Sequence, residues 1–297
     1  MKNVLILITM SLLFLAPAGA AGDILVIQSM QIKPYEDALR GCKSVCKERT
    51  NKFFSSSLSE AEVTGRVRKM KPDLILAIGQ DALVKLREIR DVPIVYLMVL
   101  NPRTLIKENS NITGVSMNVA PEKQLSLMRQ LLPHLRKISI LYDPEKTGSY
   151  VSRVYNTAAL LGIEVLAKGV HSSREAVASI DGMRGNVDAL WLIPDITIVN
   201  PSTIDILLLT TLEKNIPVLT FSDKYVEKGA LLSLEVDAAE AGRQAGEMAN
   251  RILTGAQAKN IEKEDALGSI LTVNLIVAKK LGITINGNLL KQARVIR

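Results

Sequence analysis

From Asp23 onward, short apolar segments alternate with longer amphipathic segments along the chain. This alternation is typical of the strand–helix units that build a parallel sheet. The apolar segments of the first third predict strands at Ile24–Gln28, Leu74–Ile78 and Ile94–Val99, with a short strand near Lys52–Ser55. The amphipathic segments predict helices over Pro34–Cys46, Leu58–Met70 and Asp81–Ile89. Together these elements predict one compact α/β lobe.

A second series of the same kind begins after Ser116. It predicts helices over Pro121–Leu132, Ser149–Leu161, Arg174–Met183 and Ser202–Lys214, which alternate with strands at Ile138–Tyr142, Glu164–Ala167, Ala189–Ile193 and Pro217–Thr220. Pro121 and Pro201 suit helix starts, and Gly162 suits a helix end. Two such lobes predict a ligand cleft outside the carboxyl ends of their strands.

The order of elements changes in the last quarter of the chain. The pattern predicts a strand at Ala230–Val236, a long helix over Ala238–Leu253, a strand at Ile270–Val273 and two terminal helices. No low-complexity linker separates the lobes, which favours several short crossings over one flexible tether. We therefore expect this tail to recross between the lobes.

The first twenty residues have the pattern of a cleavable secretory signal peptide. Lys2 precedes an apolar run from Val4 to Leu15, small residues follow at 17–21, and we expect cleavage after Ala20. The run is shorter than the roughly 20 residues that a membrane-spanning helix needs. An uncleaved helical anchor and an N-terminal core strand are the alternatives. No cysteine stands at the cut, which argues against a lipid-anchored lipoprotein.

Composition and charge narrow the class of partner. The chain is 47% apolar with few aromatic residues, which suits a globular α/β protein. Its formal net charge of +7 falls to +6 without Lys2, and the basic residues are scattered rather than clustered. Scattered charge with an export signal argues against nucleic acid as a partner. The cationic balance suits an anionic ligand or a membrane surface equally well.

The residues that usually carry catalysis are sparse. The two histidines, His134 and His171, lie far apart in sequence, and no serine-hydrolase elbow, phosphate-binding loop or metalloprotease motif occurs. Cys42 and Cys46 share one helical face, and we expect free thiols rather than a disulfide, and a disulfide rather than a metal site. Gly242 and Gly246 predict close helix packing. We expect no cofactor and no enzyme activity.

Several segments carry a resemblance to a known family when they are taken in order. They are VPIVYLMVLNP at 92–102, NITGVS at 111–116, QLSLMRQLLP at 124–133, ISILYDP at 138–144, WLIPDITI at 191–198, EKNIPV at 213–218, KGALLSL at 228–234, GRQAGEMANRILTG at 242–255 and NLIVAKKLGI at 274–283. This ordered set resembles the substrate-binding proteins of ATP-binding-cassette importers, in the family that includes tryptophan-binding members. It covers nearly the whole mature chain.

The resemblance implies the type I periplasmic-binding-protein fold, with two Rossmann-like lobes joined by three hinge crossings. The crossings would fall near Thr113–Asn118, Ser233–Val236 and Leu271–Asn274. The N-terminal lobe would then comprise residues 21–115 and 237–271, and the C-terminal lobe residues 116–236 and 272–297. The implied function is capture of a small, polar, amino-acid-like solute by hinge closure. We expect a monomer in a Gram-negative periplasm, with an ABC permease of the inner membrane as its partner.

The strand ends supply the candidate ligand contacts. Amide, hydroxyl and carboxylate side chains at these positions suit a small polar molecule. The candidate residues are Gln28, Ser29, Gln80, Asn101, Ser116, Asp195 and Asp223. Asp195, Asp223 and Asp237 are equally suited to capping turns and helices. Tyr142 and Trp191 are candidates to stack on a ring or to fill the core.

The sequence departs from the family pattern at several of these positions. Gln80 stands where threonine is frequent, Asn101 where aspartate is usual, Ile196 where asparagine is usual, and Ala238 where tyrosine is common. Because the departures fall where ligand would be held, they leave its identity open. A signalling or scaffold module of the same fold, which regulates a membrane partner without transport, is the main alternative. An exported enzyme is the weaker one.

Overall fold

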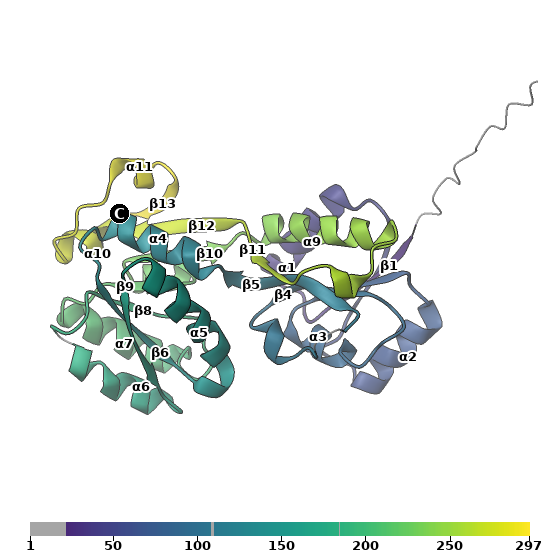
Figure 1. Ribbon diagram of the computed structural model, residues 1–297, viewed down its shortest axis with the longest axis horizontal. Helices are drawn as coiled ribbons and strands as arrows, with labels where there is room; N and C mark the ends of the chain where they lie inside the picture. Colours follow the sequence, from purple (N-terminus) through teal and green to yellow (C-terminus); the bar gives the residue numbers. More distant parts are fainter. Residues whose placement is uncertain (1–21, 108–109, 184) are drawn as a thin grey trace, which may run out of the picture.

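The computed structural model describes residues 22–107, 110–183 and 185–297, so the predicted signal peptide lies outside the described residues. Two α/β lobes lie side by side, each built on its own sheet (Figure 1). The prediction of an α/β fold with two parallel-stranded lobes is confirmed, apart from one antiparallel strand pair. Within the described residues, no helix is both long enough and apolar enough to cross a membrane.

The N-terminal lobe holds a six-stranded sheet in the order β11-β5-β4-β3-β1-β2. Its strands, all parallel to their neighbours, are β1 (Asp23–Gln28), β2 (Arg49–Phe54), β3 (Leu74–Ile78), β4 (Ile94–Val99), β5 (Ile112–Val119) and β11 (Glu264–Ala266). Its helices are α1 (Lys33–Val45), α2 (Glu60–Met70), α3 (Gln80–Leu86) and α9 (Ala238–Leu253), with short turns η1 (Pro102–Thr104) and η3 (Ala258–Asn260). One face packs against α1 and α9, and the other against α2 and α3.

The C-terminal lobe holds a seven-stranded sheet in the order β13-β12-β10-β9-β8-β6-β7. Its strands are β6 (Lys137–Tyr142), β7 (Glu164–Gly169), β8 (Ala189–Trp191), β9 (Val218–Thr220), β10 (Leu232–Val236), β12 (Ser269–Asn274) and β13 (Ala293–Ile296). Its helices are α4 (Pro121–Leu131), α5 (Pro144–Leu160), α6 (Ser173–Ser179), α7 (Pro201–Glu213), α8 (Asp223–Glu227), α10 (Leu275–Lys280) and α11 (Gly287–Leu290), with the turn η2 (Asp181–Met183). Strand β12 runs antiparallel to β10.

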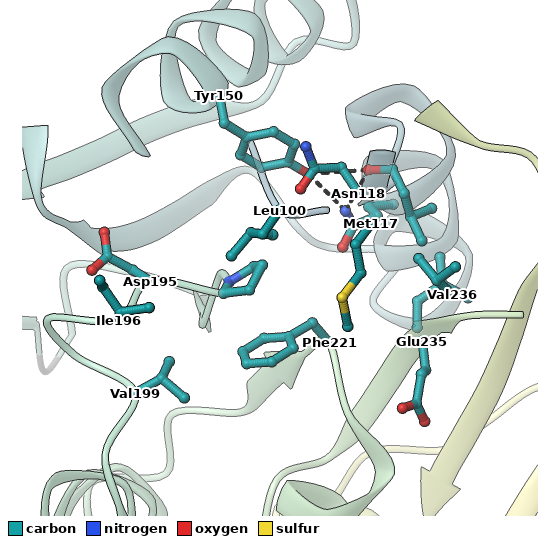
Figure 2. Close-up of a pocket in the computed structure, with 14 residues that line it drawn as sticks. Leu100, Met117, Asn118, Tyr150, Asp195, Ile196, Val199, Phe221, Glu235 and Val236 are labelled. Atoms are coloured by element: carbon teal, nitrogen blue, oxygen red, sulfur yellow. Dashed lines mark hydrogen bonds between the residues drawn. The ribbon is translucent and has the colours of Figure 1, made fainter. Parts of the chain in front are cut away.

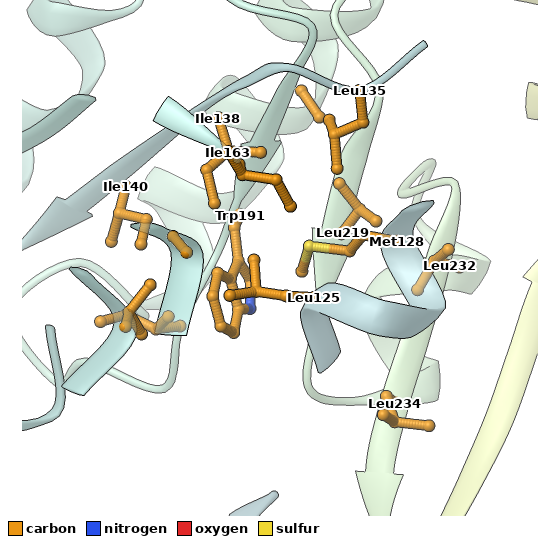
Figure 3. Close-up of a cluster of buried hydrophobic side chains, with 14 of the residues drawn as sticks. Leu125, Met128, Leu135, Ile138, Ile140, Ile163, Trp191, Leu219, Leu232 and Leu234 are labelled. Atoms are coloured by element: carbon orange, nitrogen blue, oxygen red, sulfur yellow. The ribbon is translucent and has the colours of Figure 1, made fainter. Parts of the chain in front are cut away.

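Each lobe has a core on both faces of its sheet. Strands β3 and β4 are buried along their whole length, as expected for parallel strands covered on both faces. In the C-terminal lobe, α4 and α5 cover a cluster in which Trp191 lies near Leu125 and Met128 of α4 (Figure 3). Trp191 is 1% exposed and meets Tyr150 of α5 edge-on at 6.2 Å between ring centroids. Trp191 is therefore a core residue.

Helices α1 and α9 approach closely because small residues line their interface. A Cβ atom on Gly242 would stand 1.9 Å from the Ala38 carbonyl oxygen, and one on Gly41 would stand 1.9 Å from that of Ala239. The packing role predicted for Gly242 is confirmed. Cys42 and Cys46 are both free and buried near this interface, as expected, and burial raises the pKa of the Cys42 thiol to about 12.

Three segments join the lobes. The chain leaves the N-terminal lobe between β5 and α4, returns between β10 and α9, and leaves again between β11 and β12. The third crossing lies between Ala266 and Ser269, just before the expected Leu271–Asn274, since β12 pairs with β10 from Ser269 onward. Val236 packs against the cores of both lobes. The exact residue ranges of the lobes remain a proposal.

Candidate functional site

A cavity of about 190 Å³ lies where the two lobes meet the hinge (Figure 2). The N-terminal lobe contributes Leu100, which follows β4. The residues of the hinge strands and the C-terminal lobe that line it are Met117, Asn118, Val119, Gln124, Tyr150, Pro194, Asp195, Ile196, Val199, Phe221, Leu234, Glu235 and Val236. Most of this lining is apolar. The cavity is therefore suited to the apolar part of a small molecule.

A smaller, polar cavity adjoins the first, and Asn118 and Tyr150 line both. Charged residues of both signs and several amides and hydroxyls line it, namely Tyr96, Asn101, Pro102, Arg103, Ser116, Ser149, Arg153, Lys263, Glu264 and Asp265. Burial raises the pKa of both Tyr96 and Tyr150, so neither phenol ionises at neutral pH. The two cavities together offer an apolar end and a charged end.

Hydrogen bonds across the hinge shape the polar cavity. Asp265 of β11 accepts a hydrogen bond from Ser116 Oγ at 2.7 Å and forms an ion pair with Arg153 of α5. Asn118 Nδ2 donates to Asn101 Oδ1 at 3.3 Å, and Asn101 Nδ2 donates to the Lys146 carbonyl at 3.4 Å. Because Arg153 and Lys146 belong to the C-terminal lobe, these contacts connect the two lobes on one side of the cleft.

Asp195 has its hydrogen-bonding capacity occupied by neighbouring loops. One carboxylate oxygen accepts the Asp143 backbone N–H at 2.8 Å and the Thr147 hydroxyl at 2.5 Å, and the other accepts the Thr197 backbone N–H at 2.9 Å. The residue is 1% exposed. It lines the apolar cavity, yet its carboxylate holds together the turns that follow β6 and β8. These contacts match the capping role that the sequence offered as one of two alternatives for Asp195.

Three of the seven predicted site residues line the two cavities, and the other four do not. Asn101 and Ser116 line the polar cavity, and Asp195 lines the apolar one. Gln28, Ser29 and Gln80 lie at strand ends of the N-terminal lobe and line neither cavity. Asp223 begins α8 and lies 3.8 Å from the guanidinium of Arg294. Their role in ligand binding remains a proposal.

The strand-end contacts of the N-terminal lobe are internal. Gln28 donates through Nε2 to the Met30 carbonyl at 2.7 Å and to Glu36 at 3.0 Å. Ser29 Oγ accepts the Ala82 backbone N–H at 3.0 Å and thereby fixes the start of α3. Gln80 is exposed at this start. These residues therefore shape the lobe edge that faces the cleft.

Sequence reasoning missed most of the apolar lining. Asn118 and Met117 lie in a segment interpreted as a bare crossing, and Phe221 follows β9 beside the predicted Asp223. The available signal was positional, because Leu100, Ile196 and Phe221 all follow the carboxyl ends of parallel strands. The predicted contacts were amide, hydroxyl and carboxylate side chains and so did not include Leu100 or Phe221, while Ile196 was noted only as a departure from the family pattern.

Comparison with known proteins places the chain among binding proteins. The family model for ABC transporter substrate binding proteins matches residues 37–296. A tyrosine-binding protein of Clostridioides difficile (strain R20291) is 30% identical over 194 residues, which is 62% of this chain and 56% of that relative. The match thus spans little more than half of the relative's length.

Two solved structures confirm the type I periplasmic-binding-protein fold. The ligand-free, open form of a substrate-binding protein with adhesive properties from Clostridium difficile gives a TM-score of 0.75 at 22% identity and covers 93% of this chain and 99% of its own. An ABC domain from Streptococcus pneumonia in complex with L-Trp gives a TM-score of 0.65 at 23% identity. The match covers 93% of this chain and 100% of that domain's chain. Since the family model matches most of its length, the chain belongs to the ABC transporter substrate binding protein family, whose members bind substrates and are not enzymes.

Proposed function

We propose that the chain is the periplasmic solute-binding protein of an ABC importer, and that it captures an amino-acid-like solute between its lobes. The cavity at the hinge carries this proposal, because both lobes and two of the crossings line it. A solute held there contacts Leu100 from one lobe and Phe221 from the other. Contacts with both lobes favour the closed arrangement over the open one, which is the energetic basis of hinge closure.

The chemistry of the two cavities supports an α-amino acid with an apolar side chain. The apolar cavity would take the side chain, and the adjoining charged cavity would take the ammonium and carboxylate groups. A tyrosine-binding relative and a structural neighbour in complex with L-Trp support the same class. The early expectation of a small polar solute is thereby narrowed to one with an apolar part.

The cellular setting follows from the proposed role. An export signal cleaved near Ala20, a monomer free in the periplasm and an ABC permease of the inner membrane complete the proposal. Closure would present the two lobes to the permease in one fixed relative orientation. The histidines support no catalytic alternative, since His134 precedes β6 and His171 follows β7, and these two strands are parallel. They therefore lie at opposite ends of the sheet.

A thermal-shift screen of the chain from residue 21 onward tests the proposal. Amino acids, nucleosides, sugars and oxyanions would each be added in excess, and a true ligand at one hundred times its Kd adds about 2.7 kcal/mol of stability. We expect an apolar or aromatic amino acid to raise the Tm. The shift should be lost in Phe221→Ala and kept in Ile206→Ala, which removes a half-exposed side chain of α7. If no compound in the panel raises the Tm, the result would instead favour a signalling or scaffold module.

A further inference from the structure

Three hydroxyl side chains form a row across the C-terminal sheet. Ser233 of β10 pairs with Thr220 of β9 on one side and with Thr272 of β12 on the other. Residues directly opposite each other in neighbouring strands present their side chains on the same face of a sheet. The three hydroxyls therefore lie side by side, in the two strands that carry the chain to and from the hinge and in their neighbour β9.

The row faces α8 rather than α4 and α5. Leu232 and Leu234 alternate with Ser233 and belong to the core beneath α4 and α5, so Ser233 points to the opposite face. On that face Val218, two residues before Thr220, packs with Tyr225 and Val226 of α8. Helix α8 contacts β9, β10 and β12, so it covers the strands that carry the row.

All three hydroxyls are buried and lack a protein partner. Thr220, Ser233 and Thr272 are 2%, 0% and 3% exposed. Within the described part of the chain, none of their hydroxyl oxygens has a hydrogen-bond partner. Buried polar groups in folded proteins are nearly always hydrogen-bonded, because leaving one unpaired forfeits its interaction with water. Three such groups in one row require a shared explanation.

The spacing of the strands supplies it. Neighbouring strands lie about 4.8 Å apart, and no direct hydrogen bond joins any two of these three hydroxyl oxygens in the described structure. A water molecule between two such oxygens reaches both. Buried water molecules typically make about three hydrogen bonds to otherwise unpaired groups, and the row offers three.

We propose that at least one water molecule is bound beneath α8 and is shared by the hydroxyls of Thr220, Ser233 and Thr272. This site is separate from the solute cavity, because none of the three residues lines it. Its partners span β9, β10 and β12, so the water connects the two hinge strands to the body of the sheet. Helix α8 thus rests on a hydrated layer at this point, next to the start of the hinge.

Isosteric removal of the hydroxyls tests this site. In the full mature protein, Thr220→Val and Thr272→Val should each lower the Tm by about 2–4 °C, the shift expected when one hydrogen bond is lost. The double variant should lose less than the sum, because removing one hydroxyl already weakens the shared water. The control is the double variant of Thr220→Val with Thr211→Val. The wild-type Thr211 hydroxyl donates to the Leu207 carbonyl at 2.8 Å and has its own partner. These two substitutions should be additive.

The opposite results overturn the proposal. An unchanged or raised Tm in both single variants would show that the hydroxyls lie in a dry environment. Full additivity of Thr220→Val with Thr272→Val would show that they share no partner. A Tm that depends on Na⁺ or K⁺ at constant ionic strength, and loses this dependence in Thr272→Val, would assign the site to a cation instead. A high-resolution crystal structure should show water within hydrogen-bonding distance of at least two of the three oxygens.

Discussion

Arg153 and Asp265 form an ion pair that joins the two lobes, because Arg153 lies on α5 of the C-terminal lobe and Asp265 on β11 of the N-terminal lobe. The Asp265 side chain is 15% exposed and also accepts a hydrogen bond from Ser116 of the first crossing. The pair therefore sits where a hinge motion would change the relation between the lobes. It borders the charged cavity that we propose for the ends of the solute.

Removing this pair should loosen the ligand-free lobes. We expect Arg153→Gln to increase the radius of gyration measured by small-angle X-ray scattering, while the free energy of unfolding falls by about 1 kcal/mol or less, since the pair is partly exposed. Arg243→Gln is the matched control, because Arg243 pairs with Glu240 and Glu247 of its own helix. An identical radius of gyration in the Arg153 and Arg243 variants would show that the pair does not restrain the lobes.

We expect substitution of Asp195 to lower the free energy of unfolding, because its carboxylate holds neighbouring loops together. Its buried carboxylate accepts three hydrogen bonds, so Asp195→Ala leaves buried donors unpaired and should cost about 3 kcal/mol in chemical denaturation. Asp205→Ala removes an exposed carboxylate that pairs with Lys228 and should cost less than about 1 kcal/mol. Equal stability of the two variants would refute the structural role.

The wild-type protein should lose stability relative to its Glu235→Gln variant as pH rises, because the pKa of Glu235 is raised in the folded state. Burial, and then the charge of Asp223, raises the pKa of Glu235, while the backbone hydrogen bond from Asp223 and the charges of Arg294 and Lys224 lower it. The folded state therefore holds this proton more tightly than the unfolded state, and the stabilising contribution is lost as pH rises from the ordinary value of 4.5 through the folded pKa. We expect the stability of Glu235→Gln relative to wild type to increase over this range. A difference that is independent of pH would contradict the raised pKa.

The α1–α9 interface should tolerate no added methyl group. A Cβ atom on Gly242 would meet the Ala38 carbonyl, so Gly242→Ala should cost about 3 kcal/mol or prevent folding. Gly65 of α2 has no atom within 4 Å of its added Cβ, and Gly65→Ala should add about 0.5–1 kcal/mol of helix stability. Denaturation midpoints of the two variants that move in the same direction would count against this packing.

The sequence predicted the central strands β3 and β4 well but missed two of the four edge strands, β11 and β13. β3 and β4 match their predicted bounds because unbroken apolar runs between polar turns mark strands buried on both faces. β5 was interpreted as a crossing, and β11 and β13 were not predicted. The three residues of β11 are Glu264, Asp265 and Ala266, which become a strand only by pairing with β5. Such pairing is a property of the fold and leaves no local pattern.

The same reason limits what the sequence reveals of the site. Helix α5 begins at Pro144 rather than at the predicted Ser149, because Asp143 caps it and Pro144 suits its first turn. The cavity brings together Leu100, Tyr150 and Phe221, which lie far apart in sequence. Which strand ends face a common cleft depends on how the lobes are joined, and no single segment encodes that.

The most direct test of solute capture measures the distance across the cleft. Spin labels on Ser57→Cys and His171→Cys would follow the exposed ends of β2 and β7, the strands at one outer edge of each sheet, and neither position lines the apolar or the polar cavity of the proposed site. The native cysteines are buried and should not react. We predict that the amino acid with the largest thermal shift moves the distance distribution to shorter values at saturation. An unchanged distribution at saturation would contradict capture by closure of the two lobes.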